Sequence, residues 1–141
     1  MIDVGFHEAG EVEDEVLKFA VIAAEYDNEW IYVRHRERDT WEIPGGHREE
    51  NEDITDTAKR ELFEETGAKK FSIRPVCDYS VTRNEKTTYG RLFYSVINEL
   101  GKLPNLEIEE IKLFENMPRN LTYDEIQPHL FKKVLDWKDN L

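Results

Sequence analysis

Apolar positions along the chain are concentrated in short stretches separated by polar, turn-prone residues, a pattern typical of β-strands. LKFAVIAAEY and EWIYVRHR, residues 17–26 and 29–36, are both rich in β-branched and aromatic side chains. Asp27 and Asn28 lie between them and favour a turn, so the two stretches predict a β-hairpin. WEIPGG, residues 41–46, follows as a short extended segment that two glycines close.

The pattern changes to helical spacing at Asn51 or Asp53, where a polar side chain can cap the first turn. Acidic residues follow in that turn, and Gly67 stands where a helix commonly ends in a left-handed residue. These signals predict a helix over residues 53–66.

Three more strands are predicted after this helix. KFSIRPVCDYSVTR and TYGRLFYSVINEL, residues 70–83 and 88–100, flank the turn-prone NEKT. EEIKLFENMP, residues 109–118, is a further short strand that Pro118 ends.

A second helix is predicted at the end of the chain, where Gln127 is a candidate cap and Pro128 suits the first helical position. Its apolar stripe consists of Leu130, Phe131, Val134, Leu135 and Trp137. Strands interleaved with two helices indicate an α/β fold in which helices cover a mixed sheet. No repeat, low-complexity tract or long linker divides the chain, so we expect one domain over residues 1–141.

The composition limits the kinds of partner. The chain has 141 residues with 39% apolar content, enough to bury one ordinary core. Lys and Arg number 19 and Asp and Glu 31, so the formal net charge is 19 − 31 = −12. This acidic balance disfavours a nucleic-acid polymer, whose binding usually rests on a basic surface. A small phosphorylated ligand is compatible with it where a bound divalent cation reverses the local field.

Cysteine content and hydropathy indicate a cytoplasmic protein. Cys77 is the only cysteine, so no intrachain disulfide forms. The longest apolar run, residues 19–24, is far shorter than the roughly 20 residues that span a bilayer. We therefore expect no membrane partner, and the sequence leaves monomer and homodimer open.

Three glutamates, Glu61, Glu64 and Glu65, fall within one turn at the end of the predicted helix. Helical geometry places Glu61 and Glu65 on the same face as the apolar side chains, with Glu64 on its flank. Partly buried carboxylates at the negative end of a helix dipole cost free energy unless a cation compensates them. An oxygen-rich acidic cluster suits Mg²⁺ or Mn²⁺. The alternative is a solvated acidic face paired with Lys59 or Arg60.

The stretch GHREENEDITDTAKRELFEETGA, residues 46–68, resembles the Nudix box, the signature of hydrolases that cleave diphosphate linkages in nucleoside derivatives. Leu62 and Ala68 occupy its apolar positions, although Ala68 is smaller than the usual aliphatic residue. The resemblance implies a Nudix-type α/β/α sandwich with a mixed central sheet. The fixed positions of the box are all present, as Gly46, Glu52, Arg60, Glu61, Glu64, Glu65 and Gly67.

The resemblance also implies a metal site. Glu64 and Glu65 match the divalent-metal ligands of the family, and Glu61 matches the glutamate that binds a further metal or acts as base. The carbonyl of Gly45 often joins this set. The expected reaction is Mg²⁺-dependent hydrolysis of a phosphoanhydride, in which metal activates water and a glutamate takes its proton.

Glu52 and Arg60 match a pair that is usually interpreted as a salt bridge orienting the loop and the helix. An arginine fork can hold a carboxylate in this way through two hydrogen bonds. Gly45 and Gly46, which follow Pro44, fit a tight turn that lets the backbone approach a metal or a phosphate closely.

Further candidates lie outside the box. Arg34, His35 and Arg36 end a predicted strand and are candidates for substrate phosphates, although strand alternation sends His35 to the opposite face from the arginines. Asn120 lies where similar MutT-type enzymes keep groups that read the base. In some family members the base lies on a late loop, for which the candidates here are Glu107, Glu109 and Glu110, with an exposed acidic turn as the alternative.

Residues outside the box limit the number of candidate substrate classes. Family members that act on ADP-ribose tend to have a proline at positions where this chain has Arg83 and Asn84. Dinucleoside polyphosphate hydrolases tend to have a tyrosine where this chain has Asn84, Glu85 and Lys86. WEIPGG is similar to the EFPGG segment of MutT-type pyrophosphohydrolases. We therefore expect a nucleoside triphosphate, with 8-oxo-dGTP as a candidate. The alternatives are a hydrolase of nucleotide sugars, ADP-ribose or dinucleoside polyphosphates, and a non-catalytic nucleotide sensor.

Overall fold

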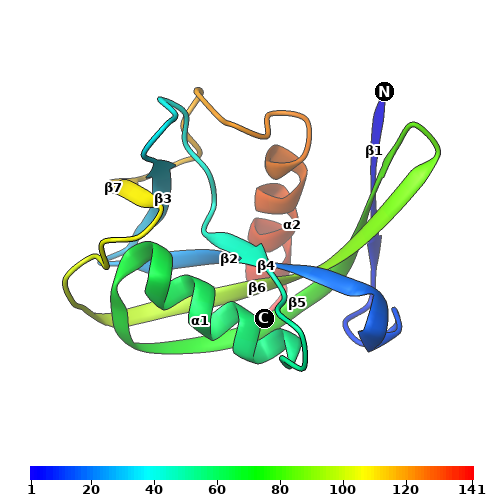
Figure 1. Ribbon diagram of the computed structural model, residues 1–141, viewed down its shortest axis with the longest axis horizontal. Coiled ribbons are helices and arrows are strands. Elements are labelled where there is room, and N and C mark those ends of the chain that lie inside the picture. The colour runs from blue at the N-terminus through cyan, green and yellow to red at the C-terminus, as the bar shows by residue number, and fades with distance from the viewer.

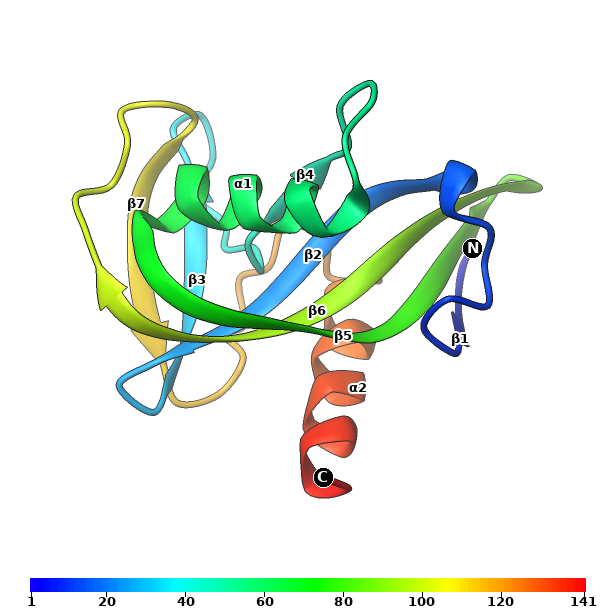
Figure 2. The ribbon, with the colours of Figure 1, turned by 90° about the horizontal axis from the view of Figure 1, so that it is seen from below.

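A twisted, mixed β-sheet forms the middle layer of the molecule, with one helix on each face (Figure 1, Figure 2). This arrangement is that of a computed structural model, which describes all residues, Met1–Leu141. Seven strands form the sheet in the order β1-β5-β6-β2-β3-β7, and β4 pairs with β2 outside this path. Their bounds are Ile2–His7 (β1), Leu17–Tyr26 (β2), Glu29–His35 (β3), Gly45–His47 (β4), Ala68–Arg83 (β5), Lys86–Leu100 (β6) and Ile108–Phe114 (β7).

The sheet is mixed because β2 and β6 run parallel, whereas all other pairs are antiparallel. The predicted hairpin of β2 and β3 is present, and its turn residues Asp27 and Asn28 have φ values of 56° and 66°. Only two residue pairs join these strands before they separate. This separation leaves the first half of β2 free to pair with β4, which brings Gly45 and Gly46 onto the sheet.

Two N-terminal elements were not predicted from the sequence. The strand β1 lies at the edge of the sheet and pairs with β5 from Ile2↔Arg83 to His7↔Asp78. A single 3-10 turn, η1 (Asp14–Val16), then leads directly into β2. The alternation of Ile2, Val4 and Phe6 with Asp3, Gly5 and His7 is a strand signal that the prediction missed, whereas η1 is too short to give a periodic signal.

The helix α1 (Ile54–Thr66) confirms the predicted helix and both of its ends. Asp53 caps it, since its side chain accepts a hydrogen bond from the Thr55 N–H at 2.9 Å. Gly67 ends it in the left-handed conformation, with φ of 80°. A Cβ at this position would also lie 2.7 Å from the Lys102 carbonyl oxygen, so both conformation and space require glycine.

The helix α2 (Gln127–Asp139) is present as predicted, but the capping role predicted for Gln127 is wrong. Ile126 precedes the helix and makes no side-chain capping bond, while Gln127 is the first helical residue and is buried. The side-chain Oε1 of Gln127 accepts a hydrogen bond from the Ile43 N–H instead, at 2.8 Å. This contact ties the start of α2 to the segment that precedes β4.

Each helix covers its own face of the sheet and has its own part of the core. The buried side of α1 presents Ile54, Ala58 and Leu62 to one face. The buried side of α2 presents Leu130, Phe131 and Val134 to the other, whereas Leu135 of the predicted stripe is 37% exposed. The α/β/α layering expected from the sequence is therefore confirmed (Figure 2). Neither helix has the length and hydropathy required to span a membrane.

Candidate active site

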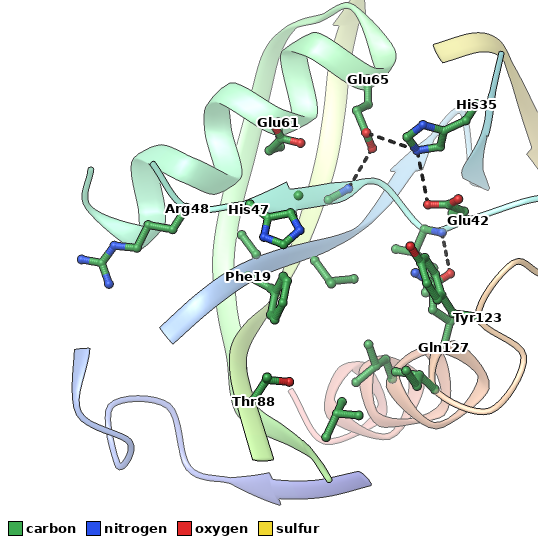
Figure 3. Close-up of a pocket in the computed structure, with 18 of the residues that line it drawn as sticks. Phe19, His35, Glu42, His47, Arg48, Glu61, Glu65, Thr88, Tyr123 and Gln127 are labelled. Carbon is green, nitrogen blue, oxygen red and sulfur yellow. Dashed lines mark hydrogen bonds and ion pairs between the residues drawn. The ribbon is translucent and has the colours of Figure 1, made fainter. Parts of the chain in front are cut away.

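A cavity of about 1070 Å³ opens beside the C-terminal half of α1, β4 and the start of α2. Glu61 and Glu65 face it from α1, Phe19 and His47 lie against the sheet, and Tyr123 and Gln127 lie near α2 (Figure 3). The cavity thus combines carboxylates with aromatic and amide groups. Its lining includes Phe19, His35, Glu42, Gly45, Gly46, Arg60, Glu61, Glu64, Glu65, Tyr79, Glu107, Tyr123 and Gln127.

The two glycines of β4 allow the strand to fit between β2 and α1. A Cβ at Gly45 would lie 2.4 Å from the Ala20 carbonyl oxygen, and a Cβ at Gly46 would lie 1.8 Å from Glu61 Oε2. Real side chains do not approach so closely. The predicted tight turn at Gly45 and Gly46 is wrong, because both residues belong to strand β4. Their lack of a side chain leaves room for the Ala20 backbone and the Glu61 carboxylate, and an approach to a metal or a phosphate stays a prediction.

Arg60 holds the glutamates of the box together. Its guanidinium donates two hydrogen bonds to the Glu52 carboxylate, at 2.7 and 3.0 Å, as expected for an arginine fork. The Nη1 group also binds Glu61 at 2.6 Å and Glu64 at 3.2 Å, and Nη2 binds the His47 carbonyl at 2.9 Å. The guanidinium of Arg60 therefore joins the loop after β4 to the carboxylates at the end of α1.

Glu65 is the most buried of these glutamates, with 7% of its side chain exposed. Its Oε1 accepts the Gly45 N–H at 3.0 Å, and its Oε2 lies 3.8 Å from His35 Nε2. The same histidine nitrogen lies 3.4 Å from Glu42 Oε2, and Glu42 also pairs with Arg38. Two buried carboxylates thus flank a single imidazole (Figure 3).

The carboxylates differ in their affinity for a proton. Burial raises the pKa of Glu61 from 4.5 to about 7, against the opposing charge and hydrogen bond of Arg60. Burial also raises the pKa of Glu65 to about 8, and the Gly45 N–H opposes this shift. In contrast, the hydrogen bonds from Arg60 lower the pKa of Glu52 to about 2. Glu52 is therefore ionised and structural in character, whereas burial outweighs the Arg60 contact at Glu61 and the Gly45 N–H at Glu65.

This set of donors fits a hard divalent cation. Glu61 Oε2 and Glu65 Oε2 accept no hydrogen bond, and both belong to carboxyl groups whose raised pKa a cation would lower. Oxygen ligands of this kind suit Mg²⁺ or Mn²⁺. No three acidic or histidine side chains are already gathered as a ligand set. Arg60 occupies one oxygen of Glu61 and one of Glu64. Arg60 would have to release part of this contact for both side chains to serve as ligands.

Of the predicted substrate contacts at and after the end of β3, only His35 lines the cavity. Arg34 pairs with Glu110 at 3.2 Å, and Arg36 pairs with Glu109 at 2.8 Å, so both arginines hold β3 against β7. These pairs also engage two of the three candidate bases on the late segment. Glu107 is the candidate that reaches the cavity, with its Oε2 4.0 Å from His35 Nδ1.

Asn120 does not line the cavity. It is exposed, and its side chain donates a hydrogen bond to the Asp39 carbonyl at 3.4 Å. The amide that does line the cavity belongs to Gln127, which is 5% exposed. Because Oε1 of Gln127 is engaged by the Ile43 N–H, its side-chain NH₂ group, which has no partner within the protein, is available to a ligand. Sequence reasoning missed this residue, since the adjacent Pro128 marked it only as a helix start.

Glu42 was also missed, although it lies in the WEIPGG segment. It is 7% exposed and pairs with Arg38 and His35 at the edge of the cavity. Alternation along an extended segment cannot distinguish an inward glutamate from an exposed one without knowing which face is covered. Phe19 likewise lines the cavity and packs edge-on against the His47 ring, with 4.6 Å between ring centroids.

A sheet between two helices, with the glutamates of one helix end facing a double-glycine strand, is the arrangement of a Nudix domain. The family model described as NUDIX domain matches residues 16–134. The chain therefore belongs to the Nudix family, as the box predicted. Members of this family generally use divalent metal ions and act on small nucleotide substrates.

Individual relatives are similar over different lengths. YtkD of Bacillus subtilis (strain 168), which has the provisional name 8-oxo-dGTP diphosphatase, is 30% identical over 106 residues, covering 74% of this chain and 66% of YtkD. Nucleoside diphosphate-linked moiety X motif 6 of Mus musculus is 56% identical over 39 residues, which are 28% of this chain and 12% of that protein. The matches thus span less than two thirds of either relative.

Among solved structures, a mutant of the Bacillus subtilis pyrophosphohydrolase BsRppH is similar over most of the chain. The two superpose with a TM-score of 0.78 at 25% identity, covering 96% of this chain and 90% of that one. At 96% coverage, the superposition extends into the first 15 residues, which the family model does not match.

Proposed function

We propose that this chain hydrolyses a phosphoanhydride bond of a nucleoside triphosphate, with Mg²⁺ or Mn²⁺ held by Glu61, Glu64, Glu65 and the Gly45 carbonyl. The observation that carries the proposal is the pair of open oxygens, Glu61 Oε2 and Glu65 Oε2, beside a cavity large enough for a nucleotide. The family membership and the complete box support the same reaction class.

The cation would neutralise charge on the phosphate oxygens and lower the pKa of a bound water. The protein would supply the proton acceptor. Glu61, whose Oε2 accepts no hydrogen bond, is a candidate for this role only where it leaves the cation to Glu64, Glu65 and the Gly45 carbonyl. Glu107, which also lines the cavity, is the second candidate for the base.

Gln127 supports a base that presents an oxygen or another acceptor. Its NH₂ group offers a free donor to an oxo group of a purine, whereas the amino group of adenine would meet only Oε1, which already accepts the Ile43 N–H. Guanine and its oxidised form have such an acceptor. The provisional name of YtkD agrees with this choice, and we therefore place 8-oxo-dGTP and dGTP ahead of dATP.

A turnover assay with Mg²⁺ tests the proposal. The panel would contain dGTP, 8-oxo-dGTP, dATP, ADP-ribose, a nucleotide sugar and a dinucleoside polyphosphate, with products separated by anion-exchange chromatography. We expect a nucleoside monophosphate and pyrophosphate from a guanine triphosphate, and no products once a chelator is added. Turnover of only a different compound in the panel would contradict the triphosphate proposal and assign the enzyme to the substrate class of that compound. Saturable binding without turnover across the whole panel would instead indicate a nucleotide sensor.

A further inference from the structure

Arg48 follows β4 and lines one end of the cavity, with its guanidinium extending away from Glu65 and Gln127 (Figure 3). Its Nε donates to the Glu52 carbonyl at 2.6 Å. Its Nη1 donates to the carbonyls of Asp14 and Leu17 at 2.6 and 3.2 Å, and its Nη2 binds Asp14 Oδ2 at 2.7 Å. A guanidinium has five N–H groups, so these four bonds leave only one free for any other partner. The Arg48 guanidinium therefore uses four of its five N–H groups to bind other segments of the protein.

The N-terminal segment that Arg48 contacts is itself fixed to the sheet. Asp78 of β5 is fully buried and accepts hydrogen bonds from the N–H groups of Gly10 and Val12, at 3.0 and 3.3 Å. Arg91 neutralises Asp78 through a bond of 2.7 Å. Because β1 also pairs with β5 along its length, the chain before β2 is anchored at two points ahead of Asp14.

On its other side, Arg48 acts on the loop that contains Glu52. Arg48 binds the Glu52 backbone carbonyl, while Arg60 binds the Glu52 carboxylate and continues to Glu61 and Glu64. Polar contacts thus run without interruption from Asp14 to the glutamates that face the cavity. Contacts outside the ligand shell commonly fix the orientation of metal ligands and so affect the affinity for the metal.

We propose that the segment before β2 is a brace for the glutamate site, with Arg48 as its positioning residue. Residues 1–15 precede the region that the family model matches, so the brace is an addition to the matched domain. Through Arg48 it holds the loop of Glu52, and through Arg60 it sets the position of Glu61 and Glu64. The inference rests on the proposed function where it concerns the cation, but the ordering of the loop can be measured without one.

The test compares Arg48→Met with wild type in the full chain. Arg119→Met is the matched control, because Arg119 is exposed and its side chain makes no hydrogen bond or ion pair. Binding of Mn²⁺ without nucleotide is measured by electron paramagnetic resonance, and amide hydrogen exchange is measured over residues 49–53. We expect Arg48→Met to raise the Kd for Mn²⁺ about tenfold and to speed exchange in this loop. Every value for Arg119→Met should stay unchanged.

Two milder variants keep the proposal testable if Arg48→Met does not fold. Arg48→Lys retains the charge but cannot reach all acceptors, and Asp14→Asn retains the backbone carbonyl but weakens the bond to Nη2. Both should change Mn²⁺ affinity in the same direction by a smaller factor. Unchanged Mn²⁺ affinity together with unchanged loop exchange would overturn the brace. If wild type binds no Mn²⁺, the proposed function fails, and hydrogen exchange in the loop alone then decides whether the brace exists.

Discussion

The Glu61 carboxylate fills the space that a side chain at position 46 would need, since a methyl group on Gly46 would lie 1.8 Å from Glu61 Oε2. The atom in the way is the end of a flexible side chain, so the clash is relieved when the Glu61 carboxylate moves. The glycine therefore does more than allow a turn, because it determines where an open oxygen of the candidate metal site lies.

Replacement of Gly46 by alanine should separate folding from activity. We expect Gly46→Ala to displace Glu61 and to lower kcat by about 10²-fold, the scale at which a preorganised electrostatic group acts. The free energy of unfolding should fall by about 1 kcal/mol, the low end of the cost of overpacking. Steady-state kinetics and urea denaturation measure the two effects. Gly5→Ala is the matched control, since its Cβ would meet Ser80 Oγ at 2.7 Å, on the edge strand β1. An active Gly46→Ala variant would show that the position of Glu61 is not critical.

Removal of single charges at the end of α1 should affect catalysis strongly. Glu64→Gln and Glu65→Gln keep the size of each side chain, and Glu65→Gln can still accept the Gly45 N–H. We expect each to lower kcat by roughly 10² or more at a fixed Mg²⁺ concentration, because charge that would hold the cation is lost. Glu50→Gln, an exposed change in the loop before α1, is the control. A rate close to wild type in either variant would remove that glutamate from the ligand set.

Stability without metal should fall as pH rises. The unfolded chain releases the protons of Glu61 and Glu65 near pH 4.5, whereas the folded chain keeps them until about pH 7 and about pH 8. Between these values the folded state binds more protons, so the free energy of unfolding decreases with increasing pH. Thermal midpoints measured in chelator across this range should therefore decline.

Two additions make this pH experiment specific. Glu65→Gln should have a higher midpoint than wild type in chelator at about pH 8, because the cost of ionising a buried carboxyl group is removed. Mg²⁺ should raise the wild-type midpoint more at about pH 8 than at about pH 5, since it binds ionised carboxylates. A pH-independent midpoint in chelator would contradict the burial of these groups.

Gln127 should determine which bases are accepted. Gln127→Glu keeps an oxygen for the Ile43 N–H but turns the free group from a donor into an acceptor. We expect kcat/KM for guanine triphosphates to fall and the ratio of dATP to dGTP turnover to rise by about 10-fold or more, the effect of one mismatched buried hydrogen bond. Gln127→Met removes the amide without adding an acceptor, so kcat/KM for guanine triphosphates should fall while the rise in dATP turnover relative to dGTP should be absent. Equal turnover ratios in all three proteins would show that the base is read elsewhere.

The helix α1 was predictable because its signals are local. Asp53 and Gly67 act on neighbouring backbone groups, and the change from apolar to acidic residues along one face needs only helical geometry. The spacing of the fixed residues in the box predicted membership of the Nudix family, and the match of the family model confirmed it. Prediction missed β1 although Ile2, Val4 and Phe6 alternate with Asp3, Gly5 and His7, and only the tertiary structure shows that this strand pairs with β5.

Within the cavity, the sequence by itself determined that Glu61, Glu64 and Glu65 share one helix end and that Glu52 and Arg60 suit a bidentate pair. The tertiary structure alone decided which distant groups meet them. Gln127 lines the cavity rather than Asn120, and Arg34 and Arg36 pair with β7 while His35 reaches Glu65. The physical reason is that helical spacing fixes neighbours within a turn, whereas contacts between remote segments depend on strand register and on which face each helix covers.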